Sequence, residues 1–163
     1  MSKITELKKS MIEYYNSDPK RIHHFLKVHS LAKLIGEQEG IDEKTQFILE
    51  SAALVHDIGI KPAEEKYGRC SGSLQEKEGP APTEKMLKVL DYEQSDIDRI
   101  CFLVAHHHTY EKIDNVDYQL LVEADFLVNL YEDSVSFDGI KKAYDSIFKS
   151  NSGKNICRVM FGL

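Results

Sequence analysis

The sequence predicts an all-α protein, a single-domain helical bundle of about six to eight helices. Apolar residues recur at helical spacing through most of the 163-residue chain, of which 42% is hydrophobic. No segment shows the sustained alternation of apolar and polar residues that is typical of β-strands. A chain of this length is expected to form one domain over residues 1–163, with a substantial core.

The first helices are predicted from residues that suit helix ends. Asp18 can accept a hydrogen bond from the first helical turn, and Pro19 suits the first helical position. Gly40 ends that helix, and Asp42 is expected to begin the next one, which reaches the pair His56-Asp57. The helices predicted in this half of the chain cover about 2–16, 19–39 and 42–57.

The second half of the chain begins with a less regular stretch. Pro62, Gly68 and Gly72 suggest a loop over residues 59–75, with one short helix near 63–67. Helical spacing of apolar residues then resumes. Further helices are expected over 83–90, from Ser95 or Asp96 to the histidines at 106–108, and over 116–132, 138–149 and 154–161.

The charge and the cysteines limit the functional classes. A net charge of -6 and a pI of about 5.6 argue against binding to nucleic-acid polymers. No apolar run approaches the roughly 18 residues of a membrane span, and the N-terminus lacks a signal-peptide core. The three cysteines are widely spaced, which predicts free thiols, with Cys101 buried, and a cytoplasmic protein. Assembly into a homo-oligomer is left open.

Histidines and aspartates beside apolar helix faces suggest a metal site. His56 and Asp57 follow an apolar stretch, and unpaired buried polar groups are costly. Partners are available on other helices: His24, the three histidines at 106–108, and Asp125. Neutral imidazoles and carboxylates are common ligands of divalent transition metals. Taken singly, each residue could instead be a surface group or a satisfied polar core group. The spacing alone leaves the metal site and the metal-free polar core as alternatives.

At these positions the sequence resembles the HD-domain superfamily of metal-dependent phosphohydrolases. The family's His-Asp pair is matched by Ala-Ala-Leu-Val-His-Asp-Ile-Gly at 52–59, and its distant aspartate by Leu-Leu-Val-Glu-Ala-Asp at 120–125. His24 fits the family's first histidine, because valine and alanine follow it at four and eight residues and a glycine ends the helix. His29 does not fit this phase and is expected in the core or next to the ligands. The resemblance covers about residues 20–130.

The resemblance implies the fold, the metal ligands and the activity. The expected ligands of one divalent ion are His24, His56, Asp57 and Asp125, with His56 and Asp57 at the catalytic centre. The ion could be Fe, Mn, Mg, Ni, Co or Zn. The implied reaction is hydrolysis of a phosphate ester of a nucleotide or similar small phosphorylated substrate by metal-activated water. The alternative is a regulatory protein that binds a metal and a nucleotide without turnover.

Some members of the family hold a second metal, and this chain matches that pattern only in part. His106 and His107 resemble the second-site segment, and at least one of them is expected to bind a weaker second ion. His108 is expected in solvent or next to the ligands. The family's other additional histidine is missing from the segment at 75–81, where Glu76 or Glu78 could supply an oxygen or could simply be solvated.

Two basic residues are candidates for contact with the substrate phosphate. Arg21 precedes His24 by about one helical turn, although a surface ion pair is the more common role of such an arginine. The lysine that the family often has directly after the Ile-Gly of its motif is displaced by one residue, to Lys61.

Overall fold

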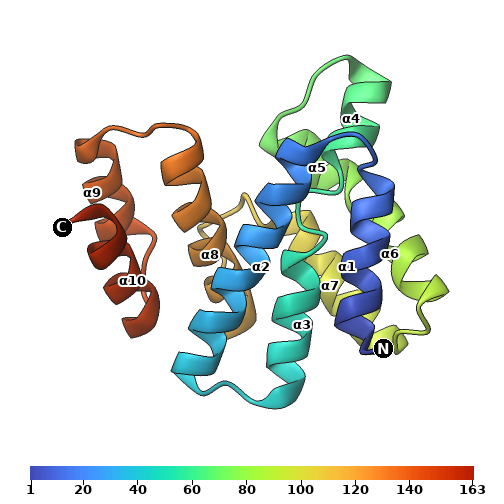
Figure 1. The fold of residues 1–163 in the computed structure, drawn as a ribbon, viewed down its shortest axis with the longest axis horizontal. Helices are drawn as coiled ribbons and strands as arrows, with labels where there is room; N and C mark the ends of the chain where they lie inside the picture. Colours follow the sequence, from blue (N-terminus) through green and yellow to red (C-terminus); the bar gives the residue numbers. More distant parts are fainter.

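The computed structural model describes residues 1–163 as ten helices and no β-strand (Figure 1). The chain is therefore all-α, as predicted, but it has more helices than the six to eight expected. The region predicted as a loop with one short helix contains two, α4 near the expected position and the unpredicted α5, which accounts for part of the difference. The helices are α1 (Lys3–Tyr14), α2 (Pro19–Glu39), α3 (Glu43–Ala53), α4 (Ile60–Tyr67), α5 (Gly72–Glu78), α6 (Pro80–Val89), α7 (Gln94–His106), α8 (Val116–Glu132), α9 (Phe137–Ser146) and α10 (Asn151–Phe161).

The predicted helix ends are confirmed where a side chain caps the helix. The Asp18 carboxylate accepts a hydrogen bond from the backbone N–H of Arg21, and Asp42 does the same for Thr45. Gly40 ends α2 with a φ of 66°, a left-handed conformation that glycine adopts without a side-chain clash. These caps set the lengths of the two helices that carry the first part of the site.

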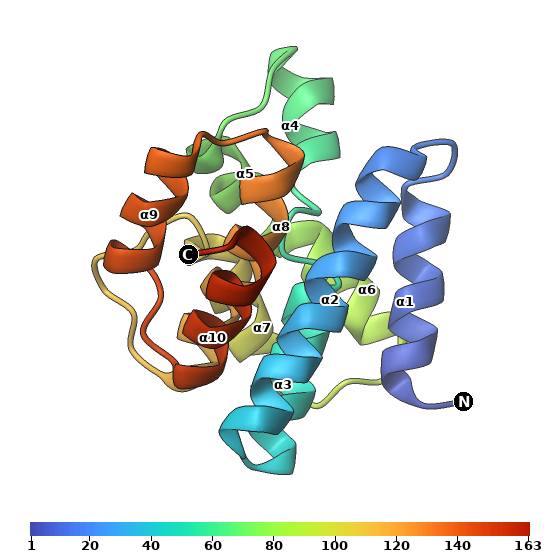
Figure 2. The ribbon, with the colours of Figure 1, turned by 60° about the vertical axis from the view of Figure 1, so that its left-hand side comes forward.

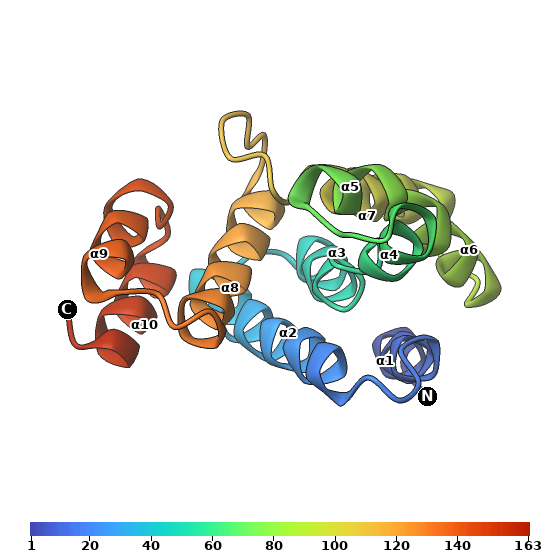
Figure 3. The ribbon, with the colours of Figure 1, turned by 90° about the horizontal axis from the view of Figure 1, so that it is seen from above.

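Helices α2, α3 and α8 form the centre of the molecule. Helix α2 packs against both α3 and α8, and α3 also contacts α7 (Figure 3). Each helix contributes fully buried apolar residues to one continuous core, including Phe25 from α2, Leu49 from α3 and Leu121 from α8. The core therefore fixes α2 and α8 beside the C-terminal end of α3, where the His56-Asp57 pair follows.

Helix α3 ends at Ala53, earlier than predicted, so His56 and Asp57 lie in the tight turn that follows it. Two glycines allow the chain to pack closely at this point. A Cβ atom added at Gly59 would lie 2.4 Å from the Gln75 carbonyl oxygen and 2.8 Å from the Gly79 nitrogen. The junction between α5 and α6 thus abuts the turn and holds it in place.

Helices α9 and α10 cover the side of α8 that faces away from α1 (Figures 1 and 2). The buried carboxylate of Glu123 anchors them, because its Oε1 accepts hydrogen bonds from the backbone N–H groups of Lys149 and Ser150. None of the ten helices has the length and apolar character needed to cross a membrane.

The three cysteines are free, as predicted, but their burial differs from the prediction. Cys157 on α10 is fully buried, whereas Cys101 is only partly buried. The Cys101 thiol lies 3.6 Å from the Pro80 carbonyl oxygen, at the contact between α6 and α7. Burial raises the pKa of the Cys101 thiol to about 11, which makes it a poor nucleophile at neutral pH.

Candidate metal centre

Four predicted ligands meet at one point. His24 comes from α2, His56 and Asp57 from the turn after α3, and Asp125 from α8. The His24 Nε2 atom lies 3.2 Å from His56 Nε2, 3.3 Å from an Asp57 oxygen and 3.3 Å from an Asp125 oxygen. His56 Nε2 is 3.4 Å from the same Asp125 oxygen. Four potential ligand atoms therefore surround a small volume at the junction of α2, α3 and α8.

The other ring nitrogens orient both imidazoles toward this volume. The Nδ1 atom of His56 is 2.9 Å from the Ala53 carbonyl oxygen, which can only accept a hydrogen bond. The Nδ1 atom of His24 is 3.4 Å from Glu132 Oε1, again an acceptor. Both Nδ1 atoms are therefore donors, and the Nε2 atoms, which face the carboxylates and each other, are the nitrogens left to bind an ion. Such a set of nitrogens and carboxylates fits a divalent transition-metal ion.

The electrostatics of the four groups lead to the same conclusion. Burial acts to lower the pKa of His24, but hydrogen bonds to Asp125 and Asp57 raise it to about 10. Burial acts to raise the pKa values of Asp57 and Asp125, but the neighbouring histidines hold both below the ordinary range. The carboxylates of buried Asp125 and half-buried Asp57 thus attract positive charge to this point, which a proton supplies in the absence of a metal.

Asp57 also faces a second group of histidines. Its Oδ2 atom is directed at His24 and His56, whereas Oδ1 lies 3.0 Å from His107 Nε2 and 3.9 Å from His108 Nε2. His107 is buried, and its Nδ1 donates to the Val104 carbonyl oxygen at 2.8 Å, so its Nε2 faces Asp57. Asp57, His107 and His108 therefore form a second possible metal-binding group that shares Asp57 with the first.

Of the two histidines expected at a second site, the structure places His107, but not His106, beside Asp57. His106 lies outside both groups: its Nδ1 donates to the Phe102 carbonyl oxygen at 2.7 Å, and its ring stacks on Phe102 at 4.2 Å. His108, expected in solvent or next to the ligands, lies beside Asp57. Helix α7 ends at His106, so the two residues that follow do not continue its helical phase. The Tyr118 hydroxyl lies within hydrogen-bonding reach of the carbonyl oxygens of His106 and Thr109, to which it can donate. This contact stabilises the turn that follows α7.

A cavity of about 180 Å³ opens beside the first group of ligands. Arg21 lines it, but its guanidinium is paired with Asp18 at 3.0 Å and with Glu64 at 2.6 Å. Lys61 is directed elsewhere, because its Nζ donates to the Tyr14 carbonyl oxygen and lies over the Tyr14 ring. The lining residues are Lys20, Arg21, His24, Phe25, Asp57, Ile60, Asn129 and Glu132.

Two residues on α8 were missed at the sequence level although helical spacing could have identified them. Asn129, four residues after Asp125, donates a hydrogen bond to Asp125 Oδ1 at 2.9 Å. Glu132, seven residues after Asp125, accepts from His24. Residues four and seven positions apart lie on the same helix face, so both side chains point toward the ligands. They orient Asp125 and His24 respectively.

The two glutamates considered as oxygen donors lie outside both groups of ligands. Glu76 accepts hydrogen bonds from the His108 backbone N–H and the Thr109 hydroxyl, both at 3.0 Å. Glu78 pairs with Lys66 at 3.1 Å and accepts from the Tyr67 hydroxyl at 2.8 Å. Glu76 therefore holds the turn after α7, and Glu78 links α5 to α4.

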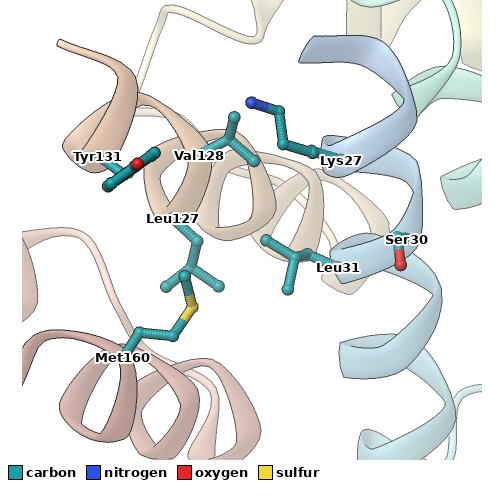
Figure 4. A pocket seen from close by; sticks show the side chains of 7 residues that line it. All are labelled: Lys27, Ser30, Leu31, Leu127, Val128, Tyr131 and Met160. Carbon is teal, nitrogen blue, oxygen red and sulfur yellow. The ribbon is translucent and has the colours of Figure 1, made fainter. Parts of the chain in front are cut away.

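A larger cavity, of about 310 Å³, lies between α2, α8 and α10 (Figure 4). It is mostly apolar, and Figure 4 shows Met160 of α10 close to Leu127 of α8. The only charged residue in its lining is Lys27, whose ammonium is 2.8 Å from Glu132. This cavity holds no group of metal ligands, so its size does not make it the catalytic site.

Comparisons with known proteins agree with this geometry. The family model described as the HD domain matches residues 21–141. A solved structure described as a predicted HD superfamily hydrolase, from an uncultured Thermotogales bacterium, has a TM-score of 0.67 and 21% sequence identity; the match covers 97% of this chain and 84% of that chain. At this identity the structural match shows a shared fold. No curated protein matches the sequence.

Proposed function

Because the chain belongs to the HD-domain family, we propose that it is a metal-dependent phosphohydrolase that cleaves a phosphate ester of a small molecule such as a nucleotide. The observation that carries the proposal is the convergence of His24, His56, Asp57 and Asp125, with both imidazole Nε2 atoms directed inward. A paired polar core would instead place a hydrogen-bond donor opposite each acceptor.

The four converging residues would hold the ion, and other residues of the chain prepare them for it. A divalent ion bound there would supply Lewis acidity, which lowers the pKa of a coordinated water and offsets negative charge on phosphoryl oxygens. Asn129 fixes one oxygen of Asp125 by a hydrogen bond. Glu132 holds the His24 Nδ1 proton, and this keeps Nε2 available as a ligand.

The cavity beside the ligands supports a phosphorylated substrate. Lys20 is exposed at its rim, and Arg21 lies between Lys20 and the metal ligand His24 in the sequence. Arg21 could meet a phosphoryl oxygen by exchanging its bond to Glu64 while keeping Asp18. A cavity of about 180 Å³ is smaller than a typical binding site for a whole ligand, so a nucleotide would extend from it into solvent. A small substrate rather than a nucleic-acid polymer also agrees with the net charge of -6.

The test is phosphate release by purified protein loaded separately with Mn²⁺, Fe²⁺, Ni²⁺, Co²⁺, Zn²⁺ and Mg²⁺. Substrates would include p-nitrophenyl phosphate and a series of nucleotides. We expect turnover with at least one ion and one ester, and its loss in Asp57→Asn. Lys20→Ala should raise KM more than it lowers kcat, whereas Lys33→Ala, at an exposed position further along α2, should change neither. Metal binding with no turnover of any ester would contradict the proposal and favour the regulatory alternative.

A further inference from the structure

His108 lies beside Asp57, yet both of its ring nitrogens already have partners. Its Nε2 atom is 2.7 Å from Gln75 Oε1 on α5, and 3.9 Å from Asp57 Oδ1. Its Nδ1 atom faces the Tyr110 hydroxyl at 3.4 Å. The nitrogen that would bind an ion together with Asp57 is therefore the one that Gln75 occupies.

The Gln75 amide blocks this nitrogen in either of its two orientations. With Oε1 toward the ring, the amide accepts the Nε2 proton, and the Nε2 atom has no free lone pair. With the amide turned over, its NH₂ group would donate to that lone pair. In both cases a metal ion must break the contact between Gln75 and His108 before it can bind Nε2.

The backbone of α5 limits how far the His108 ring can move. A Cβ atom added at Gly72 would lie only 3.2 Å from the ring, so the start of α5 lies against the imidazole. The Glu76 carboxylate holds the backbone N–H of His108 from the next turn of the same helix. The ring and its backbone are thus fixed to α5 by three successive contacts, of which only that from Gln75 engages Nε2.

We propose that Gln75 controls access of a second divalent ion to His108, so that the group of Asp57, His107 and His108 binds an ion only after the Gln75–His108 hydrogen bond breaks. The inference rests on the proposed function, because Asp57 also serves the first ion. A hydrogen bond between neutral groups changes an equilibrium constant by a factor of roughly 2 to 10. The second ion therefore binds more weakly than it would to a free imidazole by about this factor.

The test is a Mn²⁺ titration of metal-free protein that resolves a tight and a weak site. Gln75→Leu removes the amide and should tighten the weak site roughly 2- to 10-fold, with the tight site unchanged. Lys77→Leu places the same side chain at an exposed position of α5 and should change neither site. Gln75→Ala, with less bulk, should reproduce the effect of Gln75→Leu.

The role of His108 can be isolated by combining substitutions. In a His108→Ala background, Gln75→Leu should no longer tighten the weak site, because the nitrogen that it frees is absent. Nitrogen NMR of the metal-free protein gives an independent readout. It should show an Nε2 signal of His108 that differs between the wild type and Gln75→Leu, and an identical signal in the two proteins would contradict a hydrogen bond from Gln75 to this nitrogen.

The outcomes separate this inference from the proposed function. A weak site that is unchanged or weakened by Gln75→Leu overturns the inference, and a weakened site would make Gln75 a ligand. The absence of a second ion in both the wild type and the variant also overturns it. Absence of binding at the tight site would contradict the proposed function itself, because that site does not use Gln75 or His108.

Discussion

Helix α2 presents two buried histidines, His24 and His29, to carboxylates, and their surroundings distinguish the candidate metal site from a satisfied polar pair. His29 Nε2 lies 3.0 Å from Glu50 Oε2, and the other oxygen of Glu50 accepts a hydrogen bond from Gln46 at 2.8 Å. Each carboxylate oxygen there has a donor. At His24, by contrast, two imidazole nitrogens and two carboxylates face one another, with the Nδ1 protons already committed elsewhere.

The comparison teaches that burial of histidine and carboxylate is not enough to identify a metal site. His24 and His29 are separated by about 140° around the helix, so they face different neighbours. His29 meets one carboxylate, and the pair is complete without an ion. The Nε2 atom of His24 meets another histidine and two carboxylates, so a single proton there leaves part of the negative charge unbalanced, and a divalent cation can balance it.

The largest expected effect on metal affinity comes from removing the negative charge of Asp57, which belongs to both groups of ligands. Asp57→Asn should weaken Mn²⁺ binding more than 100-fold, because loss of a ligand should exceed the 10- to 100-fold loss typical of residues that only orient a ligand. His29→Leu should leave the affinity unchanged, because the His29 ring faces Glu50 and not the expected ligands. Isothermal titration of metal-free protein would measure both, and equal loss in the two variants would remove the distinction between the histidines.

Metal-induced stabilisation should separate the same two variants. An ion present at about 100 times its Kd stabilises the folded state by about 2.7 kcal/mol, which raises Tm by roughly 5–11 °C in a chain of this size. Calorimetry with and without Mn²⁺ should show this rise for the wild type and His29→Leu. It should be absent for Asp57→Asn.

Much of the difference between His24 and His29 could be predicted from the sequence. The resemblance of the His56-Asp57 pair and of the residues after His24 to the HD family indicated which residues converge, and the clear caps of α2 and α3 made these helices predictable. The histidines after α7 were harder to place, because the helix ends at His106 and contacts from Tyr118 and Glu76 decide the turn.

The short helix α5 was also difficult to predict, whereas α4 was expected near 63–67 and begins earlier, at Ile60. They lie in a stretch with Pro62, Gly68 and Gly72, and α5 has only seven residues. Their positions depend on tertiary contacts rather than on local pattern. The Gln75–His108 bond is one of these contacts, and it joins residues 33 positions apart.

Breaking the satisfied pair should affect folding rather than metal binding. His29→Leu leaves Glu50 Oε2 without its donor, and an unsatisfied buried acceptor costs about 1–3 kcal/mol. The free energy of unfolding, measured by urea denaturation of metal-free protein, should fall by that amount. Adding Glu50→Met in the same background should recover part of the loss, because no unpaired carboxylate then remains. A double variant less stable than His29→Leu would contradict this explanation.

A smaller effect on metal affinity is expected from substitution of Glu132, the last residue of α8, whose carboxylate contacts the His24 ring on α2. Removing a carboxylate that orients a metal-binding histidine lowers affinity by about 10- to 100-fold, and the long 3.4 Å contact to His24 suggests the lower end. Glu132→Gln should therefore weaken Mn²⁺ binding about tenfold. Asp133→Asn, at the exposed next position, serves as the matched control. Equal affinity in wild type and Glu132→Gln would show that packing alone orients His24.

The smallest effect is the acid sensitivity contributed by the satisfied pair. Burial acts to raise the pKa of Glu50, but hydrogen bonds from His29 and Gln46 lower it below the ordinary value near 4.5. Because the folded-state pKa lies below the unfolded one, this contribution to stability is present above about pH 4.5 and is lost as the pH falls through the folded-state value.

Glu50→Gln should therefore flatten the fall of unfolding free energy below pH 4.5, measured by urea denaturation without metal. Glu37→Gln, at an exposed position on α2, should keep the wild-type slope. Part of the slope should persist in Glu50→Gln, since Asp57 and Asp125 also have lowered pKa values. An unchanged slope in Glu50→Gln would mean that other carboxylates with lowered pKa values, among them Asp57 and Asp125, account for the acid sensitivity.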